Sequence, residues 1–232
     1  MDLVDGDPIL KEHSFSGSRS ANNPNIPSSS NPEFSRLEKE RNPLTTSIPS
    51  IEDDRKYSDK RKHTSKVESY SEVMARLESE KNKKLVRITI GNRTYVLENL
   101  NPGDVYQLEQ QLANKMYENI RSNKNDVSQI AEQTPVAESA IQQCKDHVFY
   151  NKHRLDSYEL LGEPVEYGRF DPNLQQALAW ERFKNGQATP QDLEWARHEI
   201  LESRYEARFN AGYRDSHAYA QKYANGAPWT DE

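Results

Sequence analysis

Apolar and polar positions alternate most regularly between residues 85 and 97. The segments Leu85–Ile90 and Arg93–Leu97 are rich in β-branched residues, and the pair Gly91-Asn92 separates them. A Gly-Asn pair tolerates the positive φ angles of a two-residue hairpin turn, so this pattern predicts an antiparallel β-hairpin. A lone hairpin is only marginally stable in water, and its apolar face needs helices to pack against it.

Helical spacing of apolar residues is found on both sides of this hairpin. The stretch from Ser69 to Lys81 has a narrow apolar stripe, and Ser69 with Glu72 fits a capping box. A broader stripe runs from Asp104 to Arg121. We therefore predict a helix–hairpin–helix subdomain over residues 67–122, followed by a polar connector over 123–134.

The remaining residues, 135–232, predict a helical C-terminal domain. Thr134 is the expected cap of its first helix, Asp171 of the second and Thr189 of the third, each followed by Pro at the first helical position. The expected helices cover about 135–148, 172–184, 190–209 and 215–223. The predicted fold class is α+β, mainly α-helical.

The first 66 residues predict a disordered leader. Residues 14–50 contain ten Ser, five Pro and five Asn. The segment has too few apolar groups to offset the entropy of ordering its backbone. The acidic start lacks the apolar core of a standard signal peptide, and the sequence contains no apolar run long enough to span a membrane. The basic cluster between Arg55 and Lys66 fits a solvated linker, because acidic residues dilute it, or an address for import or an anionic surface.

Charge limits the functions that the C-terminal region can have. Of the net charge of -6, residues 147–232 carry -4, from 10 basic and 14 acidic residues. That balance disfavours broad electrostatic binding of nucleic acid, which needs clustered Lys and Arg, and leaves nucleic acid only as a substrate.

The single cysteine, Cys144, excludes an intrachain disulfide and a multi-cysteine zinc site. We interpret Cys144 as a buried apolar residue, with a thiolate–imidazole pair with His147 as the alternative.

Candidate chemistry is concentrated in the same region, which holds all three tryptophans and four of the six histidines. On the expected helix 190–209, His198 and Glu202 are four residues apart on one face and can chelate a metal ion or form an acid–base pair. His217, on the next expected helix, could supply a third ligand. The alternative is a stabilising helix pair worth about 0.2–0.5 kcal/mol. The second histidine of the zinc-protease motif is absent, because its position holds Glu202.

Several polar landmarks resemble the short C-terminal toxin modules of bacterial polymorphic toxins. The resemblance covers about residues 145–229 and rests on five strings, among others: Lys145–Phe149, Gly168–Asp171, Ala179–Arg182, Glu202–Glu206 and Tyr213–His217. It implies a nuclease or another hydrolase that is delivered into a competitor or host cell. The resemblance also implies a cognate immunity protein as partner. It further implies secretion without a standard signal peptide, and a cytoplasmic location is the alternative.

The first functional hypothesis is therefore a delivered toxin or effector with a hydrolase domain, foremost a nuclease that uses acid–base or metal chemistry with a divalent ion. Its catalytic candidates are His147, His198, Glu199, Glu202 and His217, its metal candidates are His153, His198 and Glu202, and its substrate-binding candidates are Arg169, Trp195 and Arg204. The second hypothesis is a non-enzymatic helical interaction module with a disordered docking tail.

Overall fold

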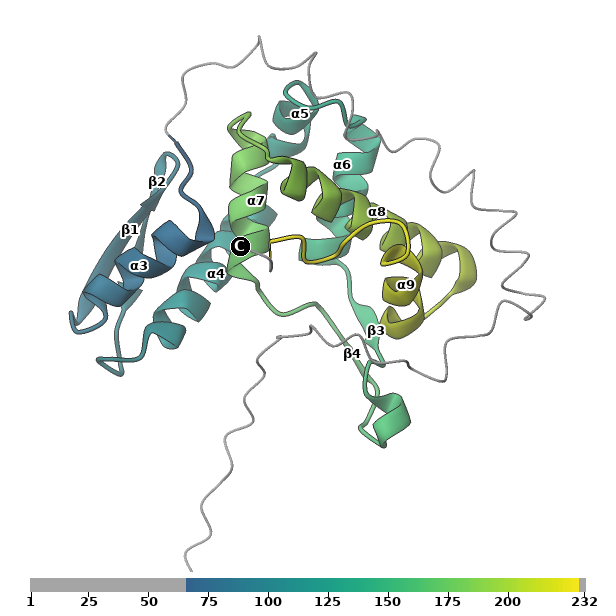
Figure 1. The fold of residues 1–232 in the computed structure, drawn as a ribbon, viewed down its shortest axis with the longest axis horizontal. Helices are drawn as coiled ribbons and strands as arrows, with labels where there is room; N and C mark the ends of the chain where they lie inside the picture. The colour runs from purple at the N-terminus through teal and green to yellow at the C-terminus, as the bar shows by residue number, and fades with distance from the viewer. Residues whose placement is uncertain (1–65, 230–232) are drawn as a thin grey trace, which may run out of the picture. The chain divides into compact units, whose positions relative to one another are not determined.

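The computed structural model describes residues 66–229, which are mainly helical with two short antiparallel hairpins (Figure 1). The predicted fold class is thus confirmed over this range. The predicted leader, with its basic cluster, lies outside the described residues except for Lys66. No helix among the described residues is long and apolar enough to cross a membrane.

The first elements follow the apolar pattern closely. Helix α3 (Tyr70–Glu80) has both bonds of the capping box between Ser69 and Glu72. Strands β1 (Leu85–Ile90) and β2 (Arg93–Glu98) pair antiparallel, and Gly91 turns between them with φ +55°. Alternate residues of β1 are buried because the inner face of the hairpin packs on α3 and on α4 (Val105–Ser122).

One hydrophobic core continues from this hairpin unit into the C-terminal helices. Helix α4 packs on α7 (Leu174–Lys184), which also contacts α8 (Pro190–Phe209). Phe149 links the two regions, because its ring lies edge-on to Tyr117 of α4 at 4.7 Å and to Trp180 of α7 at 5.3 Å. The core is thus shared between the predicted 67–122 subdomain and the C-terminal helices.

Several predicted helix boundaries are wrong. The expected connector contains α5 (Asp126–Ala131), and α6 (Glu138–Lys145) begins three residues after Pro135. Thr134 does not cap α6, because its hydroxyl donates to the carbonyl of Ile130 at the end of α5. Helix α7 is capped by the side chain of Asn173, which accepts from Gln176, so Asp171 lies outside the helix.

Two elements that the pattern did not predict lie next to each other. Helix α6 continues into a π-helical segment, η3 (Asp146–Tyr150), where the Asn151 amide donates to the Asp146 carbonyl at 2.7 Å. A second hairpin follows, with β3 (His153–Leu155) and β4 (Glu166–Gly168) joined through the 3-10 turn η4 (Glu159–Leu161) (Figure 1). Strands of three residues are too short to show a period.

A buried ion pair ties α5, α6 and α7 together. The Lys145 ammonium lies 2.6 Å from Asp126 Oδ1 and donates to the Asn123 carbonyl, while Trp180 Nε1 donates to Asp126 Oδ2 at 2.9 Å. The side chains of Lys145 and Asp126 are only 3% and 1% exposed. Because both charges have left water, each depends on the other for compensation.

We expect Asp126→Asn to lower the free energy of unfolding by about 3–5 kcal/mol, because it leaves the Lys145 charge buried without a counterion. The asparagine has one acceptor oxygen for Trp180 and turns its amide group toward the Lys145 ammonium, so the charge and its hydrogen bond are lost together. Urea unfolding measures the effect. Adding Lys145→Met removes the second charge and should recover part of the loss. A loss below about 1 kcal/mol in the single variant would contradict the importance of this pair.

Candidate metal site

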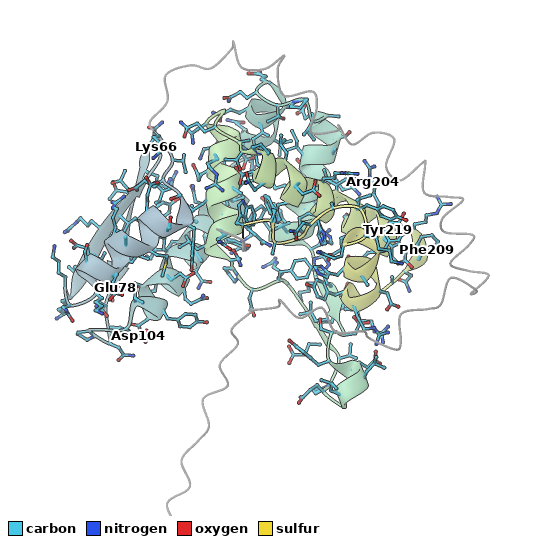
Figure 2. All side chains as sticks on the ribbon, in the orientation of Figure 1. Lys66, Glu78, Asp104, Arg204, Phe209 and Tyr219 are labelled. Carbon is cyan, nitrogen blue, oxygen red and sulfur yellow. The ribbon has the colours of Figure 1, made fainter. Side chains whose placement is uncertain are left out.

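Histidines and glutamates from four separate segments converge beside α8. One face of helix α8 supplies residues that are spaced three and four positions apart. The elements η3, β3 and α9 (Tyr213–Ala220) supply one histidine each. The cluster contains His147, His153, His198, Glu199, Glu202, Glu206 and His217. Figure 1 shows α9 beside α8, and Figure 2 labels Arg204, Phe209 and Tyr219 on these two helices.

Local sequence explains why α9 returns onto α8. Helix α8 ends at Asn210 in the left-handed conformation, and α9 begins after Gly212. A Cβ atom on Gly212 would lie 2.0 Å from Asp156 Oδ2, so only glycine fits there. The buried Asp156 carboxylate accepts from the Arg214 amide at 2.8 Å, in the first turn of α9. This contact fixes the start of the helix that carries His217.

Three ligand atoms form a nearly equilateral triangle. Glu202 Oε2 lies 3.2 Å from His198 Nε2 and 3.0 Å from His217 Nδ1, and the two ring nitrogens are 3.1 Å apart. Tetrahedral ligands held about 2.0–2.1 Å from one zinc ion are roughly 3.3–3.4 Å apart. The three atoms therefore have nearly the spacing of a bound metal site with two histidines and one carboxylate.

The orientation of the His198 ring supports this interpretation. Its Nδ1 lies 3.0 Å from the Ala224 carbonyl, which only accepts, so Nδ1 carries a proton. In the neutral ring, Nε2 then directs a lone pair toward Glu202, and two acceptors in contact need a proton or a cation between them. A backbone carbonyl on the far nitrogen is the usual partner of a metal-binding histidine. Gly226 packs so closely against this ring that a Cβ atom on residue 226 would come within 2.8 Å of it.

Glu202 also reaches a third histidine through its other oxygen. His147 Nε2 lies 3.2 Å from Glu202 Oε1 and 3.7 Å from Glu199 Oε2. His147 Nδ1 is buried and has no hydrogen-bond partner among the described residues, and its closest carboxylate, that of Glu206, is 3.7 Å away. One carboxylate thus connects histidines from η3, α8 and α9.

His153 belongs to a neighbouring part of the cluster. Its Nε2 donates to the His147 carbonyl at 2.9 Å, and its Nδ1 lies 2.9 Å from Glu206 Oε2. The Phe170 ring stacks on His153 at 4.0 Å and lies edge-on to His147. Where the sequence placed His153 with His198 and Glu202 as metal ligands, the structure brings His217 to them and groups His153 with His147 and Glu206.

Burial and mutual charge perturb the pKa values of the cluster in opposite directions. Burial is the largest influence on His147 and His198 and disfavours their charged forms, but the neighbouring carboxylates, mainly Glu202, outweigh it and raise both pKa values. Burial likewise disfavours the Glu202 carboxylate, but hydrogen bonds from three histidines lower its pKa well below the usual value. Burial and the charge of Glu202 raise the pKa of Glu199. Protons alone could therefore also hold the cluster together.

His217 is the most exposed member of the cluster. Its side chain is 39% exposed, whereas those of His147, His198 and Glu202 are at most 1% exposed. The Tyr213 ring lies 5.1 Å from the His217 ring on the same helix. A small molecule or an ion would therefore approach the triangle from the α9 side.

The other predicted residues lie outside this cluster. Trp195 has no exposed surface and packs between Phe183 and Trp229, which explains its place on an aromatic face as core packing. Arg169 is exposed and donates to the Tyr150 carbonyl, and Arg204 donates to Gln143.

Cys144 is buried, as the sequence indicated. Burial, with a smaller contribution from the charge of Glu199, raises the pKa of its thiol well above the usual value, which disfavours the thiolate that a nucleophile requires.

Two supporting residues escaped the sequence-based prediction. Asp156 and Gly226 position α9 and the His198 ring, but their partners lie 58 and 28 residues away in the chain. The sequence pattern around these residues contains no signal for such contacts. Comparison with known proteins found no matching family model, no similar curated protein and no similar solved structure.

The raised pKa values of His147 and His198 predict how stability depends on pH without metal. The folded protein then holds more protons than the unfolded chain near neutral pH, so this stabilisation is present below about pH 6.5 and is lost as pH rises through the folded pKa values. We expect urea unfolding of the metal-free protein to show falling stability from about pH 6.5 upward. Glu202→Gln should flatten this slope, whereas Glu118→Gln, an exposed change on α4, should not.

Adding Zn²⁺ should reverse this dependence, because metal binding requires deprotonated histidines and strengthens as pH rises. An identical slope with and without Zn²⁺ would mean that the cluster holds protons only.

Proposed function

We propose that this chain is a hydrolase that uses a divalent metal ion bound by His198, Glu202 and His217. The observation that carries the proposal is the convergence of three ligand atoms from α8 and α9 at 3.0–3.2 Å, with the His198 ring held by the Ala224 carbonyl. The resemblance of residues 145–229 to toxin modules extends the proposal. In it, the protein is a nuclease toxin delivered into a target cell and neutralised by a cognate immunity protein.

Two histidines and one carboxylate are a ligand set suited to hydrolysis. Three protein ligands leave a coordination position for water, and a divalent ion such as Zn²⁺ can lower the pKa of that water to about 7. An ion held there would supply a hydroxide nucleophile for an electrophilic phosphorus or carbonyl carbon, and the ester or amide bond would break as the new bond to oxygen forms. The partial exposure of His217 supplies the route by which a substrate reaches this position.

Two arginines near the entrance are candidates for binding a phosphodiester substrate. Arg214 precedes His217 by three residues on α9, so the two occupy neighbouring positions on the helix surface. Arg154, whose side chain is 51% exposed, lies 3.6 Å from Asp156, the residue that also binds the Arg214 amide. The Arg154 guanidinium also pairs with Glu159 and that of Arg214 with Asp215, so a phosphate would bind by replacing these carboxylates. Arg169 and Arg204, which the sequence proposed for this role, stay as further candidates.

A second function, a non-enzymatic interaction module, has an observation in its favour. The β3–β4 hairpin exposes apolar side chains, among them Leu160 at 66%, Leu161 at 78% and Tyr167 at 71%. Exposed apolar patches commonly mark protein–protein contacts. In this alternative, protons alone join the buried histidines to Glu202, and the cluster stabilises the helices that present the hairpin.

The proposal is tested on purified protein incubated with plasmid DNA or RNA and Zn²⁺, Mn²⁺ or Mg²⁺. We expect metal-dependent cleavage, and His198→Ala, Glu202→Gln and His217→Ala should each reduce it by roughly 10²–10⁴-fold, the range that one positioned catalytic group contributes. Glu118→Gln serves as the matched surface control. The same variants should relieve toxicity when the chain is expressed in bacteria.

Circular dichroism identifies variants that keep the fold, and only these are compared. Full cleavage and toxicity in folded His198 and Glu202 variants would reject the catalytic site. A wild-type protein that binds no metal and cleaves neither substrate would favour the interaction module.

A further inference from the structure

We propose that the site holds a second divalent ion, bound by His147, Glu199 and Glu202, so that the Glu202 carboxylate bridges two metal ions. This inference rests on the proposed function and deepens it. It assigns a metal-binding role to a histidine from η3 and to Glu199, which lies on α8 but outside the triangle of ligands described above.

The two oxygens of Glu202 face different sets of ligands. Oε2 lies within 3.2 Å of His198 and His217, whereas Oε1 lies 3.2 Å from His147 Nε2. His147 Nε2 is in turn 3.7 Å from Glu199 Oε2, and the three ligand atoms of this second group all lie within 4.8 Å of one another. A carboxylate with ligands gathered at each oxygen is the arrangement of a bridge between two ions.

The unpartnered nitrogen of His147 is an independent observation for a cation. If Nε2 donates a proton to Glu202 in the neutral ring, Nδ1 is left as a bare acceptor in a dry interior, 3.7 Å from the Glu206 carboxylate. If Nε2 binds a metal ion instead, Nδ1 carries the proton and directs it toward Glu206. Carboxylates in this position commonly orient metal-binding histidines.

Two ions also divide the work of phosphodiester hydrolysis. In two-metal sites, with ions about 3.5–4 Å apart, one ion holds the attacking oxygen and both stabilise the charge on the phosphorus and the leaving oxygen. The oxygen of water forms a bond to phosphorus while the bond to the ester oxygen breaks. The proton that the water loses passes to the leaving oxygen, which gives an alcohol and a phosphomonoester. We therefore infer phosphodiesters as the substrate class.

The two ions should differ in accessibility. The first is bound partly by His217, whose side chain is 39% exposed, whereas His147 and Glu199 are 1% and 8% exposed. The second ion therefore lies on the buried side of Glu202. We expect it to exchange more slowly than the first.

The test counts ions bound to the full chain after metal has been removed with a chelator. Titration with Zn²⁺, followed by calorimetry and elemental analysis, should give two ions per wild-type chain. Glu199→Gln and His217→Ala should each bind one fewer, and Glu118→Gln should bind two. Loading with Mn²⁺ gives a second readout on the wild-type protein, because ions that share a carboxylate show an exchange-coupled electron paramagnetic resonance spectrum.

The outcomes separate this inference from the proposed function. One bound ion in the wild-type chain overturns the second site but leaves the hydrolase proposal, and no bound ion overturns both. Two ions with an uncoupled Mn²⁺ spectrum, or two ions in folded Glu199→Gln, overturn the bridged assignment. The spectrum of the wild-type protein decides the question even if Glu199→Gln does not fold.

Discussion

The arrangement of the C-terminal elements depends on the compensation of one buried carboxylate. Glu202 is 1% exposed, and an isolated charge in such a place would destabilise the fold by several kcal/mol. Three histidines remove that penalty, and each comes from a different element: η3, α8 and α9. The connections outside the cluster serve the same end, because the contact between Asp156 and the Arg214 amide fixes α9, and the Ala224 carbonyl fixes the His198 ring. Packing and chemistry therefore share one set of residues, whether a proton or a metal ion lies between them.

The sequence predicted most of the local structure that capping and periodicity control. The first hairpin, the Ser69 capping box, the Thr189 cap and the end of α7 at Lys184 all follow from residues within four positions of one another. Predictions failed where tertiary contacts decide. Helix α5 forms in a polar stretch because Val127 and Ile130 reach the core, and Thr134 prefers a carbonyl of that helix to capping the next one.

The candidate site shows the same division. His198 and Glu202 could be paired from the sequence because four residues make one helical turn, and His217 was named as the third ligand from its place on the next helix. No spacing rule indicated that His147 would meet Glu202 across 55 residues, or that His153 would turn to Glu206. The π-helical segment matters here, because the wider turn after Lys145 changes the direction in which η3 presents its side chains.

The position of Ala224 and Gly226 against His198 has a consequence for the order in which the molecule is made. The ligands appear along the chain from residue 147 to 217, and the carbonyl that sets the His198 tautomer comes later still. The histidines and glutamates have no complete set of partners until the segment around residue 226 has left the ribosome. The chemical competence of the cluster is therefore a late event in biosynthesis.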